Sequence, residues 1–175
     1  MKSVFASAFI ALLAFWLSGC ASSPGKFSGV KGFEKEKYLG KWYEIARLDF
    51  RFEKDLNNTT AEYSIGKNGD IQVVNRGYNY KKSKPAEAIG TARFRGSDTV
   101  GELEVSFFGP FYGDYNIIAL DSAYQYALIA GSSTKYLWIL SRSKEIPTET
   151  RREYLEIARN NGFDTTALIW VEHNE

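Results

Sequence analysis

Cysteine and histidine are nearly absent from this 175-residue chain, which has one of each, Cys20 and His173. A single thiol cannot form a disulfide within the chain. A lone histidine close to the C-terminal end, in a segment that we expect to be mobile, argues against a Ser–His or Cys–His catalytic pair. It also argues against a transition-metal site of histidine and cysteine. The sequence therefore predicts a protein that is not an enzyme and that holds no metal and no cofactor.

An excess of charge of either sign is also missing. The chain has 22 lysine and arginine residues against 21 aspartate and glutamate residues, so its formal net charge is +1. Such a balance gives no reason to expect a nucleic acid or another polyanion as a partner. The glycines fall in turn-like stretches between predicted strands, and none forms the Gly-rich loop that binds phosphate.

The sequence has a single long apolar run, over residues 4–17. Its length of about 14 residues is too short to span a bilayer as a helix. The run follows Lys2 and ends in the letters LSG directly before Cys20. This pattern predicts a secretory signal peptide over residues 1–19. Its end resembles the bacterial lipobox, in which the cysteine is acylated, with palmitate as one such acyl group, and becomes the new N-terminus.

The lipobox resemblance implies that the protein is attached to a membrane through Cys20. Ala21 in the next position resembles the rule for export to the outer membrane, and we expect the periplasmic face. Residues 20–32 are small, polar and rich in serine and glycine, which is typical of a flexible tether. We therefore expect one folded domain, over residues 33–175, held at the outer membrane by its acylated N-terminus.

Period-two alternation between apolar and polar residues recurs along the body of the chain, broken by turn signals. One such signal is Asn68-Gly69, which favours a two-residue hairpin. The short connections exclude parallel crossovers, so we expect an antiparallel, up-and-down barrel that leaves no open edge. A helix that begins near Pro147 and ends at Asn161-Gly162, then a short strand, complete the mainly β fold. The eight predicted barrel strands cover residues 41–48, 60–65, 71–78, 87–95, 102–108, 112–121, 124–131 and 135–141, and the final strand covers residues 168–171.

Three short blocks in this order resemble the lipocalin family. Gly40 and Trp42, in the run GKWYEIAR, resemble the G-x-W signature at the start of the first lipocalin strand. The stretch that ends in Asp121 resembles the second block, although leucine stands where threonine is usual. Arg142, after the eighth strand, resembles the third block. The match extends over nearly the whole chain after the tether and looks closest to the bacterial outer-membrane lipocalins, whose nearest animal relative is apolipoprotein D.

The lipocalin resemblance implies a structural role for these signature residues. It places Trp42 at the closed end of the barrel and Arg142 across the face of its ring, a cation–π contact that contributes about 0.5–2 kcal/mol. Gly40 is expected to allow a tight entry into the first strand.

The expected functional site is an apolar cavity with a few polar groups, as in most small-ligand pockets. Trp138 has the same strand parity as Arg142 and should point inward. Asn75 is a polar residue in an inward-facing series, where a ligand head group, a neighbouring side chain or water must satisfy it. The lipocalin resemblance places Phe52 in a long loop that covers the open end of the barrel. The predicted ligand contacts are Phe52, Asn75, Phe94, Phe107, Tyr112, Tyr115 and Trp138.

The resemblance implies storage or transport of a fatty acid or a lysophospholipid, for membrane maintenance. Two alternatives remain open at this point: a structural or interaction lipoprotein whose barrel is filled by side chains, and a carrier of another hydrophobic small molecule. The run FFGPFY over residues 107–112 predicts an exposed apolar loop, and such patches commonly mark an interface. We expect a homodimer there, while a membrane contact is the alternative.

Overall fold

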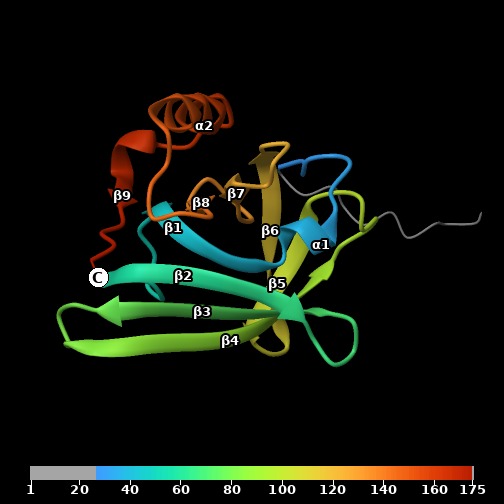
Figure 1. Cartoon of the computed structure of the whole chain (residues 1–175), viewed down its shortest axis with the longest axis horizontal. Helices are drawn as coiled ribbons and strands as arrows, with labels where there is room; N and C mark the ends of the chain where they lie inside the picture. The colour runs from blue at the N-terminus through green and yellow to red at the C-terminus, as the bar shows by residue number, and fades with distance from the viewer. Residues whose placement is uncertain (1–26, 175) are drawn as a thin grey trace, which may run out of the picture.

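A computed structural model of the chain describes residues 27–174 (Figure 1). Cys20 and the predicted signal peptide lie outside the described residues, so their assignment stays a prediction. Within residues 27–174, no helix combines the length and the apolarity that crossing a bilayer requires.

Eight antiparallel strands form a closed barrel, which confirms the predicted fold. A ninth strand pairs with β1 on the outside. In chain order the elements are α1 (Lys35–Tyr38), β1 (Gly40–Leu48), β2 (Leu56–Ile65), β3 (Ile71–Asn79), β4 (Lys84–Phe94), β5 (Glu102–Phe108), β6 (Phe111–Leu120), β7 (Tyr126–Ala130), β8 (Leu137–Ser141), α2 (Thr148–Asn160), η1 (Thr165–Ala167) and β9 (Leu168–Trp170).

Strand β1 closes the barrel because it pairs with β2 through its first half and with β8 through its second half. The β1–β8 register shifts between Glu44 and Ala46, where β1 contains one extra residue. Such a bulge changes which side chains face inward beyond it. As a result Arg47 stands opposite Trp138, and both side chains face the interior.

The β2–β3 connection is a hairpin, as Asn68-Gly69 predicts, but the predicted two-residue turn is wrong. The paired strands end at Ile65 and Ile71, so five residues connect them. The amide of Gly66 donates to the carbonyl of Asp70 at 2.7 Å and closes the wider loop. Only Gly69 takes a positive φ there, at +82°, so the loop needs a single left-handed residue.

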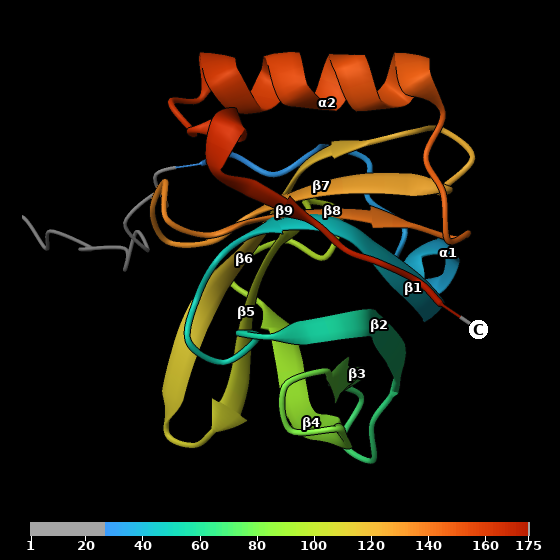
Figure 2. The ribbon, with the colours of Figure 1, turned by 90° about the vertical axis from the view of Figure 1, so that its left-hand side faces the viewer.

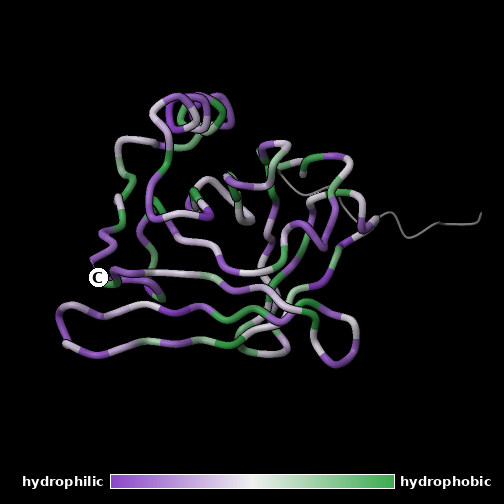
Figure 3. The backbone as a smooth tube through the Cα atoms, in the orientation of Figure 1, coloured by the Kyte–Doolittle hydropathy of each residue, from purple (hydrophilic) through white to green (hydrophobic). Residues whose placement is uncertain are grey.

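Helix α2 lies outside the barrel against β7 and β8 (Figure 2). Figure 3 shows hydrophobic and hydrophilic residues sharing this helix, as expected for one that packs on one face. Tyr154 and Ala158 form the buried face, and the Tyr154 hydroxyl donates to the carbonyl of Tyr126 at 2.8 Å. Gly162, with φ at +83°, follows the helix end as the sequence predicts.

Both ends of the described chain pack more closely than the sequence suggests. Phe27 is buried and stacks on Phe163 with ring centroids 5.0 Å apart. Val30 bonds through its backbone to β6 and to Gly101. The predicted flexible tether therefore does not extend over residues 27–32. The predicted mobility of the C-terminal segment is also wrong, because a ring nitrogen of His173 lies 2.8 Å from the carbonyl oxygen of Glu44.

Candidate functional site

The closed end of the barrel is held by Arg142 and Trp42. The guanidinium carbon of Arg142 lies 3.8 Å from the centroid of the Trp42 ring. The indole N–H of Trp42, which is fully buried, donates to the carbonyl of Tyr38 at 2.8 Å. Arg142 also donates to a set of backbone carbonyls, those of Lys37, Tyr38, Leu39, Lys41 and Tyr124. One side chain thus joins α1, β1 and the β6–β7 turn.

Gly40 and Asp121 shape the chain around that contact. Gly40 has φ at +94°, and a Cβ added there would lie 3.4 Å from Nη1 of Arg142. The backbone conformation therefore favours glycine, while a Cβ would make only ordinary van der Waals contact. The carboxylate of Asp121 accepts from the amides of Ala123, Gln125 and Tyr126, which fixes the β6–β7 turn.

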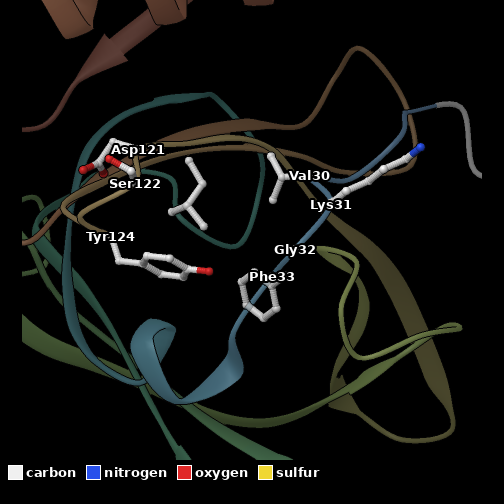
Figure 4. Close-up of a pocket in the computed structure, with 8 residues that line it drawn as sticks. Val30, Lys31, Gly32, Phe33, Asp121, Ser122 and Tyr124 are labelled. Carbon is white, nitrogen blue, oxygen red and sulfur yellow. The ribbon is translucent and has the colours of Figure 1, made fainter.

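Two hollows on the surface of residues 27–174 lie outside the barrel interior. The first, of about 150 Å³, is at the closed end, where Val30 and Phe33 lie opposite Asp121 and Tyr124 (Figure 4). Leu120 also lines this hollow. The second, of about 300 Å³, lies on the outer face of β3 to β6. Neither hollow is the predicted ligand cavity.

Tyr112 lines the outer hollow and is 41% exposed. The guanidinium of the exposed residue Arg93 lies 4.2 Å from its ring centroid. Tyr112 faces outward because successive residues of a strand alternate between its two faces. Tyr115 faces inward, and Tyr112 lies three positions before it in the same strand. We therefore exclude Tyr112 from the proposed ligand contacts.

The floor of the interior is a chain of three tyrosine hydroxyl groups. The Tyr115 hydroxyl lies 2.7 Å from that of Tyr38 and 2.7 Å from that of Tyr63. Burial raises the pKa of all three phenols, so they stay neutral. Phe94 also belongs to the floor, where its ring packs edge-on against Phe33 at 5.9 Å. The floor is thus aromatic, with its polar groups paired to one another.

Phe107 forms part of the side wall, directly over Gly90 of β4. A Cβ on Gly90 would lie 2.7 Å from a carbon of the Phe107 ring, so only glycine leaves room for this packing. Leu103 and Val105 belong to the same apolar cluster of the barrel interior. Phe107 packs against this cluster and also lines the outer hollow, so its ring lies between the interior and that hollow.

The open end is covered by the β1–β2 loop. Phe50 packs edge-on against Trp138 at 5.6 Å and against Tyr136 at 5.9 Å. The indole N–H of Trp138 donates to the Glu53 carboxyl at 2.9 Å. Phe52 is 57% exposed and lies on the outside of the loop, near Phe108. We call residues 49–55 the lid.

A buried ion pair lies beneath the lid, and the sequence analysis missed it. Arg47 donates to the Glu44 carboxylate at 2.7 Å, and both side chains are almost fully buried. Arg47 also donates to the lid carbonyl of Glu53 and to that of Leu56, each at 2.9 Å. In a regular strand, residues three positions apart face opposite sides. The β1 bulge is what brings Glu44 and Arg47 to the same side.

Two buried polar atoms in the interior have no partner among the described residues. They are Nε of Arg47 and Oδ1 of Asn75. Unpaired buried polar atoms cost about 1–3 kcal/mol each, so they call for a partner. Burial, and then the charge of Glu44, raise the pKa of Glu53 to about 8. The interior therefore combines an apolar wall with buried polar groups that lack partners among the described residues.

The described residues include no group of three or more histidine, cysteine, aspartate or glutamate side chains placed to hold a metal ion.

Comparison with known proteins agrees with this architecture. A family model described as a lipocalin-like domain matches residues 33–173. The outer membrane lipoprotein Blc of Escherichia coli strain K12 is 46% identical over 164 residues, which cover 93% of this chain and 93% of that protein. Apolipoprotein D of Mus musculus is 33% identical over 167 residues, 90% of this chain and 84% of that protein.

Solved structures of more distant proteins share the fold. Insecticyanin from the tobacco hornworm Manduca sexta superposes with a TM-score of 0.69 at 22% identity, covering 85% of each chain. The cockroach allergen Per a 4 has a TM-score of 0.66 at 24% identity, covering 83% of this chain and 91% of that one. The solved structures show the fold alone, whereas the family model and the sequence identity to outer membrane lipoproteins also show the family. The chain belongs to the lipocalin family: it is a carrier of hydrophobic ligands and not an enzyme, and the protein itself is located in the outer membrane.

Proposed function

We propose that this lipocalin stores or transports a lipid-like ligand, a fatty acid or a lysophospholipid, for membrane maintenance. One observation carries the proposal: an apolar barrel interior contains buried polar atoms that have no partner among the described residues. A lipid suits both features of this interior. Its alkyl chain can pack against the apolar wall, and its head group can form hydrogen bonds with the unpaired polar atoms.

The proposed contacts follow the geometry of the interior. Phe107 and Tyr115 would meet the alkyl chain, with Phe94 on the floor below. Asn75 and Trp138 would meet the polar part, since the Asn75 oxygen is buried without a partner and Trp138 donates at the mouth. Phe52 would contact the ligand only during entry, because it is exposed on the lid.

The N-terminal proposals complete the account. We propose that residues 1–19 are a signal peptide and that Cys20 is acylated. Each acyl CH₂ buried in the bilayer contributes about 0.8 kcal/mol, so several chains anchor the protein stably. Only six residues lie between Cys20 and Phe27, so the chain spans seven Cα–Cα steps there, which limits their distance to about 25 Å. The barrel would therefore stay close to the membrane that supplies its ligand.

A photoactivatable lysophospholipid tests the proposal in membranes that contain the full chain. After illumination, mass spectrometry identifies the labelled peptides. We expect labels on peptides from β5 and β8 that an excess of unlabelled lysophospholipid or fatty acid removes. Labels restricted to outward-facing residues, or labels that do not respond to competition, would support the alternative of a barrel filled by side chains.

A further inference from the structure

Exposed basic side chains gather at the open end of the barrel, on the lid and on the connection between β3 and β4. They are Arg51 and Lys54 of the lid, Lys81 and Lys82 of the β3–β4 connection, and Lys84 at the start of β4. Lys81 pairs with a carboxylate of the lid, whereas the other basic side chains of this set form no salt bridge within residues 27–174. We call this set the cationic face.

Direct contacts join the two segments that carry the cationic face. The amide of Tyr80 donates to the lid carbonyl of Asp55 at 3.1 Å. Nζ of Lys81 lies 2.9 Å from the Asp55 carboxylate. The side-chain amide of Asn79 donates to the lid carbonyl of Lys54 at 3.4 Å. The basic side chains therefore belong to one connected surface at the mouth of the barrel.

Carboxylates do little to balance the cationic face. The β3–β4 connection contains none, and Asp55 of the lid is paired with Lys81. Glu53 bonds to the indole of Trp138, and burial raises its pKa to about 8, so it is protonated at neutral pH. Asp49 is the one remaining acidic residue of the lid. The cationic face thus keeps a net positive charge.

The closed end of the barrel has mixed charge instead. In the β2–β3 connection Lys67 is followed by Asp70, and after β8 Lys144 is followed directly by Glu145. Basic and acidic residues also nearly balance over the whole chain, whose formal net charge is +1. The positive charge at the mouth is therefore a local feature and does not follow from the composition.

The described chain begins on the side of the barrel that carries the mouth. Phe27 stacks on Phe163 with ring centroids 5.0 Å apart. A Cβ on the adjacent residue Gly162 would lie 3.8 Å from a methyl carbon of Thr134, in the β7–β8 connection. Residues 27–33 thus start beside that connection.

The β7–β8 connection borders the mouth, because its residue Tyr136 packs edge-on against Phe50 of the lid at 5.9 Å. Figure 2 shows the lid and this connection on the same side of the barrel. The segment that leads to the proposed anchor at Cys20 therefore joins the fold on the side of the mouth.

We propose that the cationic face binds the anionic headgroups of a phospholipid bilayer, so that the mouth of the barrel faces the membrane. An anionic leaflet strengthens binding about fivefold for each lysine or arginine close to its surface. This inference goes beyond the proposed function, because it holds for any ligand in the barrel. The run FFGPFY over residues 107–112 is not part of the cationic face, so the inference is independent of the homodimer.

Acetylation of lysine residues tests the inference. The full chain in detergent is added to preformed vesicles of phosphatidylcholine alone, or of phosphatidylcholine mixed with phosphatidylglycerol, and is treated with a membrane-impermeant acetylating reagent. Mass spectrometry then measures the reaction of each lysine. We expect Lys54, Lys82 and Lys84 to react about fivefold more slowly on the anionic vesicles, whereas Lys67 and Lys144 at the closed end react equally on both.

High salt should remove the difference between the two kinds of vesicle, because it screens exposed charges. Equal reaction of the cationic face on both kinds of vesicle would overturn the inference. Slow reaction that is the same on neutral vesicles would also overturn it and would assign the surface to a second copy of the chain.

The double variant Lys82→Gln with Lys84→Gln tests whether these charges are responsible. We expect Lys54 to lose most of its protection on anionic vesicles, while the matched control Lys67→Gln with Lys144→Gln keeps it. Unchanged protection of Lys54 in the first variant would overturn the inference. None of these measurements needs a ligand, so such a result would leave the lipid-carrier function standing.

Discussion

Glu53 is the residue whose ionisation should most affect the stability of the barrel. Its pKa of about 8, against an ordinary value of 4.5, means that the folded state keeps a proton that the unfolded chain releases. Stability therefore falls as the pH rises between these two values, and the penalty is complete above the higher one. Glu44 contributes in the same direction, because burial raises its pKa too, although Arg47 opposes the shift.

The variant Glu53→Gln should remove the Glu53 part of this pH dependence. We expect its Tm to exceed that of the unaltered protein at pH 8 and to match it near pH 4.5. Thermal unfolding followed by circular dichroism across this range measures the effect. Glu62→Gln, at an exposed position, serves as control. A Glu53→Gln variant whose Tm falls with pH as steeply as that of the unaltered protein would contradict the assignment.

Arg142→Lys tests the closed end. Lysine keeps the charge, but it cannot cover the Trp42 ring and donate to several carbonyls at once. We expect the free energy of unfolding to fall by about 2 kcal/mol, from the lost cation–π contact and lost hydrogen bonds. Urea titration measures it, and Arg152→Lys on the exposed face of α2 is the control. A loss no larger than that of the control would show that Arg142 contributes little.

At the scale of elements, alternation and turn signals were enough to predict the order of the strands, the helix and the closure of the barrel. They could not predict the β1 bulge, because no alternation rule says where one extra residue enters a strand. For that reason the sequence analysis missed Glu44 and Arg47 as an interior pair. The inward position of Trp138 follows from its parity with Arg142. The same rule, applied from the inward-facing residue Tyr115, places Tyr112 on the outer face and contradicts its prediction as a ligand contact.

Two neighbouring positions of strand β4 allow a matched test of whether the ligand occupies the barrel interior. Ala88 has the inward parity of Ala92 and pairs with Asn75, whereas Glu87 is exposed. Ala88→Trp should fill the barrel and reduce lysophospholipid uptake by at least about tenfold, as expected when a pocket loses its volume. Glu87→Trp should leave uptake unchanged. Photolabelling in membranes compares the two variants, and equal labelling of both would mean that the ligand does not occupy the barrel.

At the scale of the whole molecule, the open end presents an apolar rim formed by Phe52, Phe108 and Phe111. These side chains are 57%, 64% and 79% exposed, and the first two rings lie 5.8 Å apart. Exposed apolar patches of this kind commonly mark an interface. We propose that a second copy of the chain covers this rim, while a membrane contact is the alternative.

Phe111→Ser tests the homodimer. We expect sedimentation of the full chain in detergent to show a dimer that this variant shifts to the monomer. Ile89→Ser, which also removes an exposed apolar side chain but lies on the outer face of β4, should leave the dimer intact. A monomer in the unaltered protein would refute the dimer and favour the membrane contact.

The central claim, that the barrel carries a lipid-like ligand, is tested most directly by native mass spectrometry of the full chain purified from membranes, with lipid extraction of the same sample. The account predicts a bound mass that extracts as an alkyl-chain lipid and that is lost in Ala88→Trp. A protein mass without bound lipid, which also takes up no added lysophospholipid or fatty acid, would contradict the account.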